Sequence, residues 1–167
     1  MSKWWRVLGV NREACIISVR TAVAIVISLL AARSLGLSEF YWAPISTIVI
    51  MLSTIHPLTL AWQRFAGTAL GALIGALIAN YFHPNWVIYG AGIVVCGILS
   101  QLLRLGAAYR FAAITMSVVL LVRHDRGPWI VATHRFVEVS LGIAVGLIVS
   151  LAWPAPTTTD KSASKEI

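Results

Sequence analysis

The sequence predicts an all-α, polytopic membrane protein in which six transmembrane helices form two inverted three-helix repeats. Three observations predict this fold: the chain is unusually apolar, its apolar residues form long runs, and its second half matches its first. Of the 167 residues, 59% are hydrophobic and 11% are charged, whereas soluble domains carry roughly 25% charged residues. A bilayer is the solvent that suits such a chain.

Six apolar segments follow one another, separated by charged or turn-forming residues. Most approach the roughly 20 residues that a helix needs to cross the hydrocarbon, and they do not alternate as membrane β-strands do. Each is therefore expected to be a transmembrane helix. The segments are Cys15–Leu35, Tyr41–Ile55, Phe65–Phe82, Trp86–Leu103, Ala107–Val122 and Trp129–Trp153.

The second half of the chain repeats the first after a shift of 71 residues, without a gap. RFAGTALGALIG at 64–75 matches RFVEVSLGIAVG at 135–146. Each copy (15–82 and 86–153) holds three helices, so the second copy enters the membrane upside down, which is typical of transporters. Other identities include Phe40 with Phe111, Ser46 with Ser117, and Pro57 with Pro128.

The distribution of Lys and Arg predicts the orientation. If the N-terminus is inside, eight of these residues lie on the inner side and four on the outer side, with Arg20 inside the membrane. This excess predicts that both termini are cytoplasmic. The six-helix membrane domain at 15–153 then follows a cytoplasmic segment at 1–14 and precedes a polar, disordered cytoplasmic tail at 154–167.

Three arginines are candidate ligands for an anion. Arg64 and Arg135 are expected at the starts of the third and sixth helices, on opposite faces of the membrane, where helix N-termini favour anions. A guanidinium matches a carboxylate, although each arginine could instead be an anchor that snorkels to the lipid interface. Arg20 lies inside the first helix, where a charge facing lipid costs about 2.5–3.5 kcal/mol. It should therefore face a cavity or a partner, or snorkel.

Other residues have both a structural and a functional interpretation. Tyr41 and Trp42 could stack on an aromatic substrate or belong to an interfacial aromatic belt. Glu138 and His134 could couple transport to protons, or Glu138 could form a local ion pair with Arg135, three residues earlier. The short second and fifth helices, at matching positions of the two halves, also point to a transport site. The glycines expected to pack helices together are Gly67, Gly71, Gly75, Gly142 and Gly146.

Several other functions find no support in the sequence. The basic residues, which give a net charge of +7, flank apolar runs and form no basic patch, so nucleic-acid binding is not expected. The cysteines and histidines are dispersed, so no metal site or disulfide is expected. No nucleotide or catalytic motif occurs, and we expect neither an enzyme nor a cofactor.

YWAPISTIVI at 41–50, followed by the RFAGTALGALIG segment, resembles the membrane unit of the fusaric-acid-resistance (FUSC-like) family. That family includes bacterial aromatic-acid exporters and is related to plant aluminium-activated malate transporters. The resemblance covers nearly the whole chain and implies transport of organic anions, often aromatic or other carboxylates. The second copy departs from the motif, because Glu138 and Val139 replace its Gly-Thr pair.

We therefore expect a transporter of the bacterial inner membrane that exports small organic anions. The alternatives are an anion channel and a non-transporting membrane subunit that packs against a larger partner. Six short helices make a thin wall around a solute, so a homo-oligomer is expected. Lipid and a small organic anion are the other expected partners, and an efflux partner protein is a further possibility.

Overall fold

The computed structural model describes residues 12–37, 39–53, 55–83, 85–122 and 127–154. Within them the chain is all-α, as predicted, with six α-helices, one short 3-10 helix and no strand. The segment before residue 12 and the tail after residue 154 lie outside the described residues. The elements are α2 (Arg12–Ser34), α3 (Trp42–Met51), α4 (Pro57–Tyr81), α5 (Trp86–Leu102), η1 (Gly106–Ala108), α6 (Tyr109–Leu121) and α7 (Pro128–Ala152).

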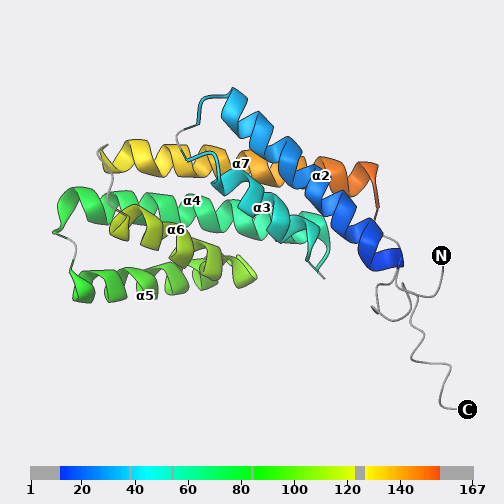
Figure 1. The fold of residues 1–167 in the computed structure, drawn as a ribbon. Helices are drawn as coiled ribbons and strands as arrows, with labels where there is room; N and C mark the ends of the chain where they lie inside the picture. Colours follow the sequence, from blue (N-terminus) through cyan, green and yellow to red (C-terminus); the bar gives the residue numbers. More distant parts are fainter. Residues whose placement is uncertain (1–11, 38, 54, 84, 123–126, 155–167) are drawn as a thin grey trace, which may run out of the picture.

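The long helices α4 and α7 form the centre of the bundle (Figure 1). Each has 25 residues and is therefore about 37 Å long. Each of the short helices α3 and α6 packs on the long helix of the other half of the chain: α6 packs on α4, and α3 packs on α7. The helices α2 and α5 lie outside. The core is thus built from contacts between the first half of the chain and the second.

The start of the third helix differs from the prediction. α4 begins at Pro57, not at Phe65, and α7 begins in the same way at Pro128. Proline suits the first position of a helix because its φ is already helical and its missing N–H has no partner to lose there. Arg64 and Arg135 are each the eighth residue of their helix, about 10 Å along its axis. The predicted positions at the helix starts are therefore wrong.

Glycines let the short helices approach the long ones very closely. A Cβ added at Gly71 would overlap the carbonyl oxygen of Ala112 in α6, and one added at Gly142 would overlap that of Ala43 in α3. Small residues at such crossings are typical of helix packing in membranes. These contacts fix how α6 lies on α4 and how α3 lies on α7.

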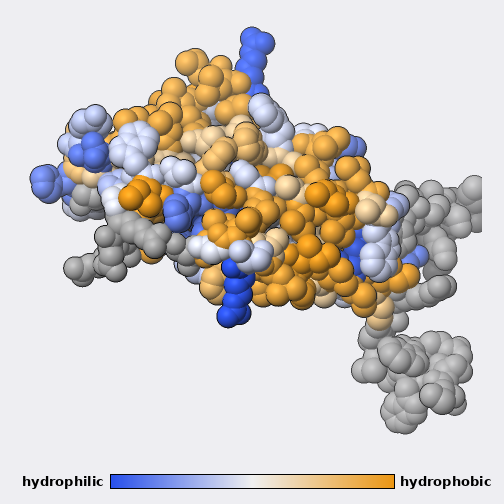
Figure 2. Space-filling view, turned by 90° about the horizontal axis from the view of Figure 1, so that it is seen from above, coloured by the Kyte–Doolittle hydropathy of each residue, from blue (hydrophilic) through white to orange (hydrophobic). Residues whose placement is uncertain are grey.

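The outer surface is largely apolar. Hydrophobic residues cover most of the face seen in Figure 2, and many large apolar side chains of the outer helices α2 and α5 are exposed. Among the described residues, two helical stretches are both long and apolar enough to cross a membrane, Glu13–Ser34 and Pro128–Ala152. The helices α3, α5 and α6 are apolar but shorter.

Candidate functional site

A small cavity of about 190 Å³ lies between α3, α4, α6 and α7. It is smaller than the roughly 300–1,000 Å³ of pockets for drug-sized ligands, so it suits a small ligand. Both of the predicted anion-binding arginines line it. The lining residues are Trp42, Ile45, Val49, Arg64, Thr68, Phe111, Ile114, Thr115, Arg135 and Val139.

Arg64 enters the cavity from α4 and is only 8% exposed. Its Nη2 donates a hydrogen bond to the hydroxyl of Ser46 at 3.1 Å, while its Nε has no hydrogen-bond partner. The guanidinium carbon lies 5.0 Å from the centre of the Phe111 ring, within the range of a cation–π interaction. Arg64 is thus held by α3 and α6 together.

Arg135 enters from α7 and is more deeply buried, at 2% exposure. Its guanidinium carbon lies 3.1 Å from the centre of the Trp42 ring. Two of its donors, Nε and Nη1, have no hydrogen-bond partner. Unpaired buried donors on a cation are costly, and an anion in the cavity would satisfy them.

The two arginines share one cavity, so the expectation that they act at opposite faces of the membrane is wrong. α4 and α7 run in opposite directions, and each arginine lies about two turns inside its helix. From there the long side chains reach the same interior space. Two separate sites with one guanidinium group each are predicted, whereas the structure has one cavity that both guanidinium groups line.

Two carboxylates lie beside Arg135. Glu138 is fully buried, and its Oε1 accepts a hydrogen bond from the backbone N–H of Glu39 at 3.0 Å. The other oxygen, Oε2, has no hydrogen-bond partner. Glu39 Oε2 in turn accepts a hydrogen bond from Trp42 Nε1 at 2.8 Å. Glu138 of α7 thus accepts its hydrogen bond from the connection before α3. Through Glu39, these hydrogen bonds link Glu138 to the Trp42 ring, which lies against Arg135.

The remaining predicted site residues do not line the cavity. Arg20 is buried between α2 and α7, where its Nη2 donates to Ser150 Oγ at 3.1 Å. Tyr41 is exposed, with its ring centre 5.5 Å from that of Trp42. His134 lines a shallow hollow with Trp129 and other α7 residues. The structure brings together Arg64, Arg135 and Trp42, with Glu138 adjacent.

Sequence reasoning misses three further residues that line the cavity: Thr68, Phe111 and Thr115. Thr68 lies in the RFAGTALGALIG segment, but the pattern of that segment does not indicate that its side chain faces a cavity. Phe111 and Thr115 lie on the short helix α6, and they join the site only because α6 packs on α4.

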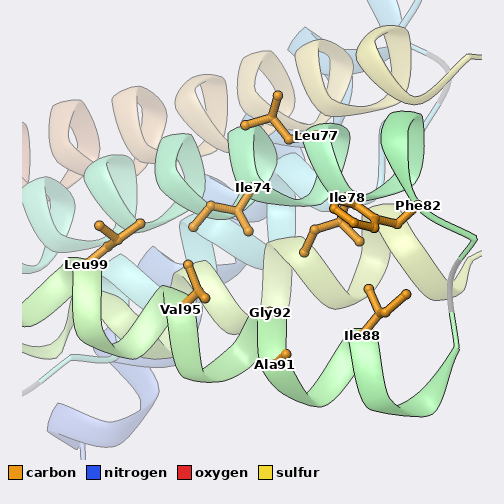
Figure 3. A pocket seen from close by; sticks show the side chains of 9 residues that line it. All are labelled: Ile74, Leu77, Ile78, Phe82, Ile88, Ala91, Gly92, Val95 and Leu99. Carbon is orange, nitrogen blue, oxygen red and sulfur yellow. The ribbon is translucent and has the colours of Figure 1, made fainter.

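A larger groove, of about 450 Å³, lies between α4 and α5 (Figure 3). Its lining is entirely hydrocarbon, with Ile74, Ile78 and Phe82 on one side and Ile88, Val95 and Leu99 on the other. No polar group in it could orient an anion. The smaller cavity is therefore the candidate site.

A family model described as "Fusaric acid resistance protein-like" matches residues 23–149, which is most of the chain. The chain belongs to this family. The resemblance inferred from YWAPISTIVI and RFAGTALGALIG is thus confirmed. With the apolar helices and the apolar outer surface, membership identifies this FUSC-like chain as a membrane protein.

One curated relative is the "Uncharacterized transporter YdhK" of Salmonella typhimurium strain LT2. It is 28% identical to this FUSC-like chain over 157 residues. The match covers 87% of the chain but only 23% of the relative, so the chain spans about a quarter of that protein. No solved structure matches the chain.

Proposed function

We propose that this FUSC-like protein carries a small organic anion, such as an aromatic or other carboxylate, across the bacterial inner membrane. The observation that carries the proposal is the cavity that Arg64 and Arg135 line together. Both arginines are buried against aromatic rings, and donors of Arg135 have no partner among the described residues. An anion that entered the cavity would meet two guanidinium groups in a setting of low polarity.

The proposed architecture is six membrane-spanning helices in two inverted repeats. Matching contacts across the two halves support it. Arg64 lies on the Phe111 ring as Arg135 lies on the Trp42 ring, and α4 packs on α6 as α7 packs on α3. The cavity then lies at the junction of the repeats, beside the starts of α3 and α6. Transport sites at the interface of inverted repeats, next to short helices, are common in secondary transporters.

These contacts also refine the alignment of the repeats. A shift of 71 residues pairs Arg64 with Arg135, but the shared contacts pair Trp42 with Phe111, a shift of 69. The same smaller shift relates Ala43 to Ala112, the partners of the two close-packed glycines. We propose that the second copy is two residues out of the ungapped register in its short helix.

The membrane orientation follows the charges that remain outside the cavity. Removing Arg64 and Arg135 from the two counts leaves seven Lys and Arg inside (8 − 1) and three outside (4 − 1), which favours cytoplasmic termini. The start of α2 and the end of α7 lie at the same end of the bundle (Figure 1). This agrees with an even number of membrane crossings.

Export is the proposed direction, because the family is described by resistance to an organic acid. A carrier is favoured over a channel because the cavity is small and bounded by four helices. We propose that a homo-oligomer completes the thin helical wall. An efflux partner protein would be a further component.

A flux assay in proteoliposomes tests the proposal. Radiolabelled benzoate, succinate and chloride are screened with wild type and with Arg64→Ala and Arg135→Ala, after monodispersity of each variant in detergent is confirmed. Wild type should transport at least one of the organic anions, and each variant should lose most of that flux. The matched control is Arg110→Ala, an exposed arginine outside the cavity, which should keep it.

Three results would contradict the proposal. Wild-type flux in both variants would remove the arginine site. Single-channel current steps in planar bilayers would indicate a pore instead of a carrier. Wild-type protein without any flux, purified in a stable complex with another membrane protein, would favour a non-transporting subunit.

A further inference from the structure

Position 138 is one place where the matched halves differ in chemistry. The shift of 71 residues pairs Glu138 with Gly67, where an added Cβ would overlap the carbonyl oxygen of Ala108. The first half therefore packs backbone against backbone at this point. The second half instead places a carboxylate between α7 and Glu39 in the connection before α3.

The surroundings of Glu138 make its ionised form costly. The side chain is fully buried, one carboxylate oxygen accepts a single backbone N–H, and the other has no partner. A buried carboxylate that lacks hydrogen bonds is stable only when positive charge is near, and it otherwise takes up a proton. The protonation state of Glu138 should therefore change when an anion binds the nearby positive charge.

The charged groups around Glu138 nearly balance. Arg135 on its own helix and Glu39 on the connection before α3 act on it directly, and Arg64 and Tyr41 act on Arg135. With both carboxylates ionised, the two arginines are neutralised. A proton on Glu138 leaves one net positive charge, which one monovalent anion would match.

Glu138 is also connected to the cavity by contacts. It binds the backbone of Glu39, the Glu39 side chain binds Trp42, and the Trp42 ring lies against Arg135. An anion on Arg135 and an ionised Glu138 thus compete for the same positive charge. Binding of either a proton or the anion should strengthen binding of the other, because such linkage is reciprocal.

We propose that Glu138 is the proton-coupling residue of this protein, taking up one proton as one monovalent anion binds between Arg64 and Arg135. The proton adds to the carboxylate of Glu138, and no other bond forms or breaks. Proton and anion then cross the membrane together without net charge, so export runs down an outward gradient of the anion that exceeds the inward pH gradient, and anion affinity falls as the pH rises. This inference rests on the proposed function, because it requires the anion site.

Proteoliposomes that contain a pH-sensitive dye test the coupling, with benzenesulfonate as the probe. The anion of a strong acid does not cross the bilayer as a neutral acid, so any proton movement reports on the protein. In wild type, an inward benzenesulfonate gradient should acidify the lumen by one proton per anion. Glu138→Gln, which mimics the protonated side chain, should carry the anion without acidification. Glu13→Gln, a carboxyl change in α2 outside the cavity lining, should behave as wild type.

Infrared difference spectra locate the proton. Adding benzenesulfonate to wild type at neutral pH should produce the C=O band of a protonated carboxylic acid. The band should be absent in Glu138→Gln and present in Glu39→Gln. The affinity of wild type should change with pH by a factor of about 5–150, the usual range of such couplings, and that of Glu138→Gln should not change.

The outcomes separate this inference from the proposed function. If wild type transports no anion at all, both are wrong. If wild type transports the anion without protons, or Glu138→Gln still moves protons with it, only the coupling role of Glu138 is overturned. A band that persists in Glu138→Gln but disappears in Glu39→Gln would also overturn it, because Glu39 would then be the coupling residue.

Discussion

The two sides of the cavity have the same frame but different chemistry. On one side α4 meets α6 and the short η1 turn before it through Gly67, Gly71 and Gly75. On the other side α7 meets α3 through Gly142 and Gly146, and a buried carboxylate stands where the third glycine would be. The close-packed glycines therefore set how the helices pack on both sides. Position 138 adds a carboxylate, which can be protonated, on the α7 side.

The arginines differ in the same way. Arg64 has a neutral hydroxyl partner in Ser46, whereas Arg135 has two unpartnered nitrogens and carboxylates nearby. The carboxylates that a proton can neutralise thus lie on the α7 side of the cavity. Substitutions at matching positions can test how far the frame is shared and where the difference begins.

The largest effect on stability is expected from alanine at the closest crossing of each side. In Gly71→Ala and Gly142→Ala the new Cβ would overlap a backbone carbonyl oxygen, which cannot rotate away. Overpacking costs about 1–3 kcal/mol, more than the roughly 0.8–1.0 kcal/mol that alanine gains in a helix. Thermal unfolding in detergent should show a similar loss for both variants. A loss in only one of them would show that the two crossings are not equivalent.

A smaller effect is expected from Trp42→Phe, which gives Arg135 the same kind of ring that Arg64 has. The ring remains, but the hydrogen bond from Nε1 to Glu39 is lost, and bonds to charged groups contribute about 1.5–3 kcal/mol. Unfolding should therefore cost about 1.5 kcal/mol less. Trp62→Phe is the control, because Trp62 is 61% exposed on α4. If Trp42→Phe adds no loss in a Glu39→Ala background, which removes the acceptor oxygen, the effect comes from this bond; an equal loss there would mean that the ring itself matters.

Much of the fold could be predicted from the sequence. The long apolar runs placed all six helices, since helix formation in a bilayer needs mainly length and hydrophobicity. The start of α4 was missed because Trp62, Gln63 and Arg64 look like the end of a polar connection. The alignment of the two halves holds the correcting signal, since Pro57 aligns with Pro128 and the predicted sixth segment starts at Trp129, one residue after the proline that begins α7.

The candidate site could be predicted only in part. Arg64 and Arg135 stand out as charges in apolar segments, and Trp42 belongs to the family motif. These three residues meet only because α3 packs on α7 and α6 packs on α4. No local sequence pattern indicates this packing. For the same reason the sequence suggests an ion pair between Glu138 and Arg135 on one helix, whereas the hydrogen bond to Glu138 comes from Glu39, 99 positions away in the chain.

Alanine at two glycines of α5 should stabilise the protein slightly. Nothing lies within 4 Å of a Cβ added at Gly90 or Gly97, so the gain in helix propensity, up to about 1 kcal/mol, is not offset. Each variant should therefore unfold at a slightly higher temperature than wild type, in contrast to Gly71→Ala. A clear loss of stability together with a smaller particle on size-exclusion chromatography would show that a second copy packs against this face of α5.

The smallest effect, and the finest test of the comparison, is expected at Gly75→Ala and Gly146→Ala. The nearest atoms to an added Cβ are Val119 Cβ in α6 and Ile50 Cβ in α3, both at 3.0 Å. These contacts are with side chains, so a slight shift of the short helix can relieve them, and the gain in helix propensity of about 0.8–1.0 kcal/mol roughly offsets the crowding. Both variants should lie close to wild type in thermal unfolding. If only Gly146→Ala is well tolerated, α3 is freer to move than α6, as expected if the side that carries Glu138 is the one that rearranges during transport. If only Gly75→Ala is tolerated, the mobile side is instead the one without the carboxylate, and the protonation of Glu138 would have to act at a distance.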